Sequence, residues 1–133
     1  MMAADSKNFI ADASFLLTLL LPDEHHHSQY HRFLNLTANP NCHFFAPSLI
    51  ESEVANALIS AHRQKRITAK DIQKILPQFF NYPINYLPVD LQKTIDLSIK
   101  YRLSFYDASY LYLSLHHHYP LLTLDQPLAV LAK

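Results

Sequence analysis

"NFIADASFLLTLLL", residues 8–21, joins two apolar runs across a single acidic residue, Asp12. The first run has the length of a buried β-strand, and the second has the length of a helix that stops near Pro22. A strand that leads directly into a helix opens a βαβ unit, in which the strands are parallel and helices cover the sheet. This stretch therefore predicts an α/β fold.

The same alternation continues along the rest of the chain. Further strands are expected at 42–47, 84–89 and 120–125, and further helices at 23–39, 48–63, 66–81, 90–102, 105–117 and 126–133. Thr68 and Asp90 are expected to cap their helices, and Pro77 is expected to kink or stop its helix. Ser48 and Glu51 have the spacing of a capping box. We expect one domain over residues 1–133, with a central parallel sheet of four strands, and a fifth left open, between two layers of helices.

Composition excludes several classes of function. The chain has no glycine, so it can form neither the phosphate-binding loop nor the dinucleotide-binding fingerprint. Its single cysteine, Cys42, cannot build a disulfide framework or a cysteine-based zinc site, which suits a reducing cytoplasm. Eleven basic residues balance eleven acidic ones, so an anionic partner needs a local basic patch or a bound metal. The apolar run 14–21 is too short to span a bilayer, and we expect a cytoplasmic protein without a membrane contact.

Four acidic residues fall where ligands bind in folds of this class. In open parallel sheets the binding site lies beyond the carboxyl ends of the strands. Asp12 follows the first expected strand, and Asp125 follows the last. Glu53 lies early in the helix after the second strand, and Asp107 opens the helix that precedes the last strand. We therefore expect these four side chains to converge at one edge of the sheet.

Each acid also has a structural alternative. Asp12 and Asp125 could be N-caps, and Ser104 with Asp107 forms an S-x-x-D variant of the capping box. Glu53 best separates a structural role from a functional one. Its helix already has a predicted cap, and Glu53 lies at the edge of the apolar stripe. A salt bridge to a neighbouring helix is the remaining structural explanation for Glu53.

The joint pattern predicts a metal site. Converging carboxylates raise one another's pKa unless a positive charge joins them, and no basic residue adjoins any of these acids in the sequence. Hard divalent cations such as Mg²⁺ or Mn²⁺ prefer carboxylate oxygens and water. Asp107 lies in the otherwise apolar stretch "LSFYDASYLYLSL", residues 103–115, and is expected to be a buried acid that the metal neutralises.

Four motifs carry a family resemblance: "FIADAS", "APSLIESEVANAL", "LSFYDASYLYLSL" and "LLTLDQPLA". In order and spacing they resemble the PIN-domain family, and within it the VapC-type toxin ribonucleases, over almost the whole chain. The resemblance implies a three-layer PIN-like α/β/α fold and a metal-dependent endoribonuclease that hydrolyses RNA phosphodiester bonds with Mg²⁺ or Mn²⁺. The family usually ends with a fifth strand, which the closing "LAVLAK" does not indicate.

The resemblance also implies roles for individual residues. Asp12 and Asp107 are expected to ligate the metal directly, while Glu53 and Asp125 are expected to act through water or at the periphery of the site. Ser14 and Thr123 match positions where a hydroxyl supports the site.

Partners are implied in the same way. The family's toxins pair with a cognate antitoxin and form homodimers, and the aromatic-rich segments 79–86 and 104–113 are candidate surfaces, with core packing as the alternative. The densest basic patch, "HRQKR" at 62–66, is expected to contact the RNA backbone through Arg63, Lys65 and Arg66. The alternative for this patch is a solvated helix end that the macrodipole favours.

Two other functions remain open at this point. A catalytically silent PIN-like module would bind RNA or protein without cleavage, although such a module would be free to lose one of the four acids. A receiver-like phospho-acceptor domain fits Asp90 and Thr123 loosely. It needs an adjacent acidic pair after the first strand and a lysine after a fifth strand, and the sequence has neither.

Overall fold

The computed structural model describes residues 6–133 and contains a parallel sheet in the strand order β3-β2-β1-β4. The strands are β1 (Lys7–Ala11), β2 (Cys42–Ala46), β3 (Ile84–Tyr86) and β4 (Leu121–Leu122). The helices are α1 (Ala13–Leu20), the short 3₁₀ helix η1 (Pro22–Glu24), α2 (Tyr30–Ala38), α3 (Ile50–Arg63), α4 (Ala69–Asn81), α5 (Leu91–Tyr101), α6 (Phe105–His117) and α7 (Gln126–Leu131). The predicted α/β fold with a four-stranded parallel sheet is confirmed.

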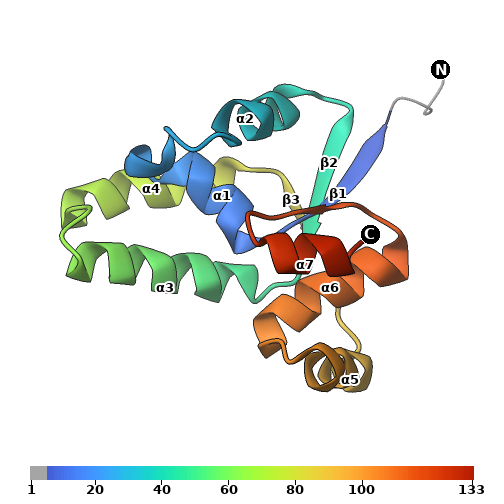
Figure 1. The fold of residues 1–133 in the computed structure, drawn as a ribbon. Coiled ribbons are helices and arrows are strands. Elements are labelled where there is room, and N and C mark those ends of the chain that lie inside the picture. The colour runs from blue at the N-terminus through green and yellow to red at the C-terminus, as the bar shows by residue number, and fades with distance from the viewer. Residues whose placement is uncertain (1–5) are drawn as a thin grey trace.

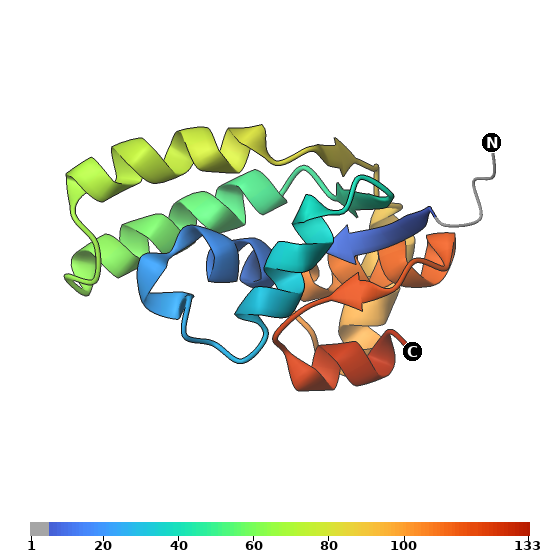
Figure 2. The same ribbon diagram turned by 90° about the horizontal axis from the view of Figure 1, so that it is seen from above.

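Helices flank the sheet on both sides. Figure 1 shows α2 on one side of the strands and α5 with α6 on the other, and α6 packs against β1. α3 and α4 run in opposite directions and extend as an arm past the carboxyl ends of the strands, as Figure 2 shows from above. Within residues 6–133 no helix combines the length and apolar character that crossing a membrane requires.

The central strand β1 and the helix α6 explain why the sequence is most apolar at these places. Phe9, Ile10 and Ala11 are all buried, because β1 lies between two strands and beneath helices. α6 is buried without interruption from Ala108 to Ser114, which confirms a helix that is enclosed on most of its surface. Phe15 in α1 is fully buried and bridges the two regions of the core around α2 and β2.

The expected helix 23–39 is wrong in its first half. η1 ends at Glu24, and α2 begins only at Tyr30. His25 explains the interruption, because its Nε2 lies 2.9 Å from the carbonyl oxygen of Leu19 and its ring stacks on Tyr30 at 4.4 Å. These contacts fold the chain back onto α1 instead of continuing a helix.

Pro77 does not stop its helix, since α4 continues to Asn81. Proline leaves the carbonyl four residues earlier without a donor, and both Pro77 and Gln73 are exposed, so water can satisfy it. Helices often end at a glycine in the left-handed conformation, and this chain has none. Three other residues take that conformation next to the ends of α3, α5 and α6: Lys65, Arg102 and His118. Thr68 and Asp90 cap α4 and α5 as predicted.

Substitution of Phe15 tests this description of the core. Its ring lies 4.7 Å from Phe33 and 5.6 Å from Phe44, measured between centroids. Phe15→Ala should lower the free energy of unfolding in urea by about 3–5 kcal/mol, because it leaves a cavity between helix and sheet. Phe80→Ala is the matched control, since Phe80 is 68% exposed and should change stability by about 0.5 kcal/mol or less. Equal losses in both variants would contradict this core.

Candidate active site

Asp12 lies at the junction of β1 and α1 and is buried, with 5% of its surface exposed. Its Oδ1 accepts a hydrogen bond from the backbone N–H of Phe15 at 3.0 Å and from the Ser14 hydroxyl at 2.6 Å. Asp12 is therefore the N-cap of α1, as its structural alternative predicted. Burial raises the pKa of Asp12, and Asp107 raises it further, against the hydrogen bonds from Ser14, Thr123 and Phe15.

Ser14 and Thr123 link Asp12 to the loop after β4. The Ser14 hydroxyl oxygen lies 3.5 Å from that of Thr123 and accepts a hydrogen bond from the N–H of Leu124 at 2.9 Å. The Thr123 hydroxyl oxygen accepts from the N–H of Asp125 at 3.0 Å. The Ser14 hydroxyl thus contacts Asp12, and the Thr123 hydroxyl contacts the backbone of Asp125.

Asp107 lies in the first turn of α6, and Asp125 is the N-cap of α7. Asp125 caps α7, accepting from the N–H of Leu128 at 3.0 Å, and its side chain is exposed. The N–H of Asp107 donates to the Ser104 hydroxyl at 3.1 Å at the start of α6. Burial raises the pKa of Asp107, and the nearby charge of Asp125 raises it further.

The expectation that Asp107 is a buried acid is met only in part. Its side chain is only half-buried, because the enclosed part of α6 begins one residue later, at Ala108. The fully buried acid of the group is Asp12. Asp107, in the first turn of α6, therefore stays partly accessible to solvent.

Glu53 is half-buried on α3 and accepts a hydrogen bond from the Tyr110 hydroxyl at 2.5 Å. Burial raises the pKa of Glu53, the Tyr110 hydrogen bond opposes this rise, and Asp12 and Asp107 add to it. The predicted capping box at Ser48 is absent, because the N-cap of α3 is Leu49 and makes no side-chain hydrogen bond.

That correction changes one step of the reasoning on Glu53. Glu51 and Glu53 both lie in the first turn of α3, where the helix dipole favours acidic side chains. The predicted cap left Glu53 no role at the start of the helix. Interaction with the helix dipole now gives Glu53 such a structural role. Glu53 is distinguished by its contact with Tyr110 and by its proximity to two other acids.

Tyr110 is a site residue that the sequence did not single out. Burial and the hydrogen bond to Glu53 raise the pKa of its hydroxyl, so Tyr110 stays protonated and donates. The signal was available in the spacing: Tyr110 follows Asp107 by three residues, which places both on one face of α6. Within an apolar helix, however, a tyrosine is read first as part of the core, where most of this side chain indeed lies.

The four carboxylates form one negatively charged group. Asp107 raises the pKa of Asp12, Asp12 and Asp107 raise that of Glu53, and Asp125 raises that of Asp107. In the part of the chain that the structure describes, ion pairs within 4.0 Å join only Arg66 with Asp23 and Glu24, so none of the four has a cationic partner. Such a group requires bound protons or a bound cation to be stable.

The oxygen atoms around Asp12 are of the kind that bind a hard divalent cation. They are carboxylate and hydroxyl oxygens, which Mg²⁺ and Mn²⁺ prefer over nitrogen or sulfur. Over residues 6–133, no three His, Cys, Asp or Glu side chains stand close enough to hold an ion by themselves. The residues therefore fit an ion held by one or two carboxylates, with water and substrate oxygens completing the shell, which is the usual manner of Mg²⁺.

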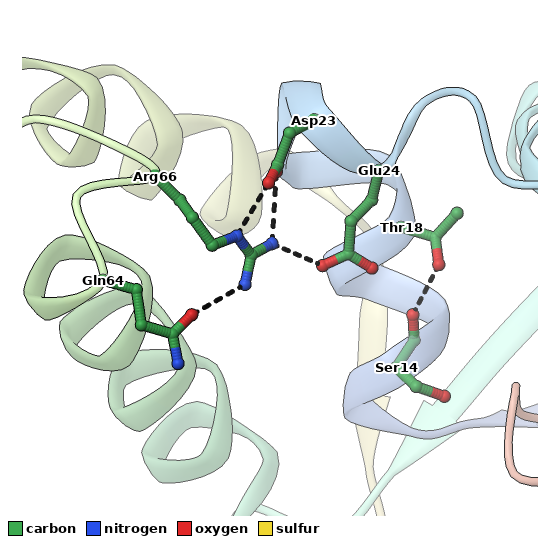
Figure 3. Close-up of polar contacts among 6 residues, drawn as sticks. All are labelled: Ser14, Thr18, Asp23, Glu24, Gln64 and Arg66. Carbon is green, nitrogen blue, oxygen red and sulfur yellow. Dashed lines mark hydrogen bonds and ion pairs between the residues drawn. The ribbon is translucent and has the colours of Figure 1, made fainter.

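The basic residues 63–66 do not join the four acids. Arg63 ends α3, and ten residues of helix separate it from Glu53, or about 15 Å along the axis. The Arg66 guanidinium donates to Asp23 at 2.7 Å and to Glu24 at 3.1 Å, and points toward η1 (Figure 3). The arm therefore carries its positive charge away from the acidic group.

Replacement of Asp12 by asparagine tests the electrostatics of the group. Because burial raises the pKa of Asp12 in the folded state, its ionised form destabilises the fold at neutral pH. In chelator, Asp12→Asn should therefore raise the melting temperature at pH 7. The difference from the unmodified protein should fade as the pH falls through the raised pKa toward the ordinary value of 3.8.

Asp71→Asn is the control of opposite sign. Hydrogen bonds from the N–H and hydroxyl of Thr68 lower the pKa of Asp71, so its ionised form stabilises the fold above its ordinary pKa. Asp71→Asn should lower the melting temperature at pH 7, and this loss should fade on acidification. A lower melting temperature of Asp12→Asn at pH 7 in chelator would contradict the predicted destabilisation by the buried, ionised carboxylate of Asp12.

Comparison with known proteins agrees with the fold. The family model described as the PIN domain matches residues 9–133. The crystal structure of PAE2754 from Pyrobaculum aerophilum is similar, with a TM-score of 0.66 and 22% sequence identity over 96% of this chain and 88% of that chain. No curated protein matches the chain significantly. The chain belongs to the PIN-domain family, whose members are in general nucleases that use divalent metal ions.

Proposed function

We propose that this protein is an Mg²⁺- or Mn²⁺-dependent endoribonuclease that hydrolyses phosphodiester bonds in RNA. The observation that carries the proposal is the group of Asp12, Glu53 and Asp107. Asp107 raises the pKa of Asp12, both raise that of Glu53, and none of the three has a cationic partner among residues 6–133. Membership of the PIN-domain family supports a nuclease. RNA as the substrate, and a role as the toxin of a type II toxin–antitoxin pair, follow from the resemblance of the four motifs to VapC-type ribonucleases.

Each acid has a role in this proposal. Asp12 and Asp107 would hold the metal directly, while Glu53 and Asp125 would act through water. A bound divalent cation would activate a water molecule for attack and stabilise the charge that develops on the phosphate. Asp12 is suited to a fixed ligand, because its cap hydrogen bonds lock its orientation.

The hydroxyl groups around the acids act as positioning residues. Ser14 donates to Asp12, and Thr123 holds the loop that carries Asp125. Tyr110 donates to Oε1 of Glu53 from a buried position, which fixes the carboxylate and leaves its Oε2 to orient a water molecule. The ionised form of Glu53 is the form that accepts this hydrogen bond best.

Two alternatives are separated by observation and by experiment. The receiver-like domain is wrong at the level of the fold, because the family is the PIN domain and the strand order differs from 2-1-3-4-5. Asp90, its proposed phospho-acceptor, instead caps α5. A catalytically silent module would keep the fold and lack cleavage, and the activity measurement below distinguishes it.

A cognate antitoxin, a homodimeric assembly and a cytoplasmic location belong to the same proposal and follow from the resemblance. Exposed aromatic side chains in the two candidate segments support a protein partner. Phe80 is 68% exposed, Tyr86 46% and Tyr106 43%. Their neighbours Phe79, Tyr110 and Tyr112 are buried, so each segment is divided between core and surface.

Cleavage of structured RNA tests the proposed activity. The purified protein should cut RNA in the presence of Mg²⁺ or Mn²⁺, and chelation by EDTA should abolish the cleavage. Asp107→Asn should reduce the rate by about a hundredfold or more, because it removes a charged ligand while keeping the first turn of α6. Denaturing gel electrophoresis measures the products.

Asp96→Asn is the matched control, since Asp96 is an exposed carboxylate on α5 whose partner is Gln92. It should cleave at the rate of the unmodified protein. Cleavage that persists in EDTA, or in Asp107→Asn, would contradict the metal mechanism. RNA binding without any cleavage by the unmodified protein would establish the silent module instead.

Tyr110→Phe tests the positioning of Glu53. The substitution removes one hydrogen bond to a charged group, so the rate should fall about tenfold. The same hydrogen bond opposes the rise of the Glu53 pKa, so its loss should move the acidic limb of the pH–rate profile to higher pH. Tyr106→Phe, on the exposed side of α6, should change neither quantity. A slower enzyme with an unmoved acidic limb would show that Tyr110 acts on the fold alone.

A further inference from the structure

The tip of the α3–α4 arm carries a basic hollow that the acidic group does not include. Figures 1 and 2 both show the arm extending past the carboxyl edge of the sheet. An open hollow of about 580 Å³ lies where the two helices join. Its lining residues are His62, Arg63, Lys65, Ile67, Thr68 and Ala69.

The charges of Arg63 and Lys65 are not neutralised by the fold. Among residues 6–133 neither has a carboxylate within 4.0 Å, and both side chains are exposed. Arg66 differs, because its guanidinium is bonded to Asp23 and Glu24 on η1, as Figure 3 shows. Arg66 thus compensates the acids of η1, and the hollow retains two positive charges that are free to bind an anion.

The turn that carries these residues is held by its own hydrogen bonds. The N–H of Lys65 donates to the carbonyl of His62 at 3.0 Å, and that of Arg66 donates to Ala61 at 2.9 Å, as in a Schellman motif. On the α4 side, the capping box of Thr68 and Asp71 satisfies the first turn. The helix ends are therefore closed, and the positive character of the hollow comes from the side chains.

The helix α3 connects the hollow to the acidic group and sets the distance between them. α3 runs without a break from Glu53 to Arg63, a separation of about 15 Å along its axis. An acidic centre repels phosphate groups, and the chain as a whole has no net charge to attract them. A polyanionic substrate therefore needs a basic contact outside the centre, and at about 3.4 Å per stacked nucleotide this distance spans about four nucleotides.

We propose that the hollow at the tip of the arm binds the phosphodiester backbone of single-stranded RNA about four nucleotides from the bond that is cut. The inference rests on the proposed RNA-cleaving function. Arg63 and Lys65 bind phosphates without reading bases, so the contact adds affinity and sets the minimum length of the strand rather than its sequence.

The salt dependence of RNA binding tests the inference directly. The double variant Arg63→Ala/Lys65→Ala is compared with its parent by fluorescence anisotropy, both in an Asp107→Asn background so that the strand stays intact. With a uridine strand of about 12 nucleotides, the slope of log K against log salt should become shallower by about 1.4, or about 0.7 per lost phosphate contact. A strand of about three nucleotides is too short to bridge the hollow and the acidic group, so the parent protein should bind it more weakly than the strand of about 12 nucleotides.

The control removes the same charge elsewhere. Arg32 on α2 and Lys100 on α5 are exposed, and Arg32→Ala/Lys100→Ala should leave the slope unchanged. An unchanged slope in the arm variant, or an equal change in the control, would overturn the inference. Polyglutamate serves as a second probe, and loss of its binding alone would overturn the inference in favour of an acidic protein. The cleavage assay is independent: an unmodified protein that cuts no RNA refutes the proposed function, whatever the slopes show.

Discussion

The site depends on one constraint, which is that Asp12 must hold a negative charge inside the protein. Its position is set by the chain itself, because it is the residue between the central strand β1 and the buried helix α1. Its Oδ1 caps that helix, so the residue that begins α1 is the one that carries charge into the site. The same side chain of Asp12 therefore serves both as the N-cap of α1 and as the proposed metal ligand.

The topology then brings the other acids to Asp12. β1 lies between β2 and β4, so the loop that follows β4 meets the loop that follows β1, and Ser14 joins them through Leu124 and Thr123. α6 packs against β1 and carries Tyr110, whose hydroxyl reaches Glu53 on α3. The acids thus come from parts of the chain that meet only in the folded protein. Because these carboxylates repel one another, binding of a cation among them should stabilise the folded state.

Sequence patterns predicted those features that depend on neighbouring residues. Apolar runs located the strands and helices, and the caps at Thr68, Asp90 and Asp125 followed from residue type and spacing. The local capping box predicted at Ser48 is absent, and the other failures depend on contacts between distant residues or on solvent. His25 interrupts a predicted helix because its ring contacts the carbonyl oxygen of Leu19 in α1. α4 accommodates Pro77 because this part of the helix is exposed to solvent. The bond between Tyr110 and Glu53 joins residues 57 positions apart, which no local pattern could reveal.

Paramagnetic broadening by Mn²⁺ tests the central claim most directly. Backbone amide resonances are assigned, and Mn²⁺ is added in small amounts while the intensity of each amide is followed. The account predicts that the amides around Asp12, Glu53, Asp107 and Asp125 lose intensity together, before those of the histidine tracts 25–27 and 116–118. Broadening that is centred on either histidine tract, or that spares one of the four acidic segments while affecting the others, would contradict a shared metal site.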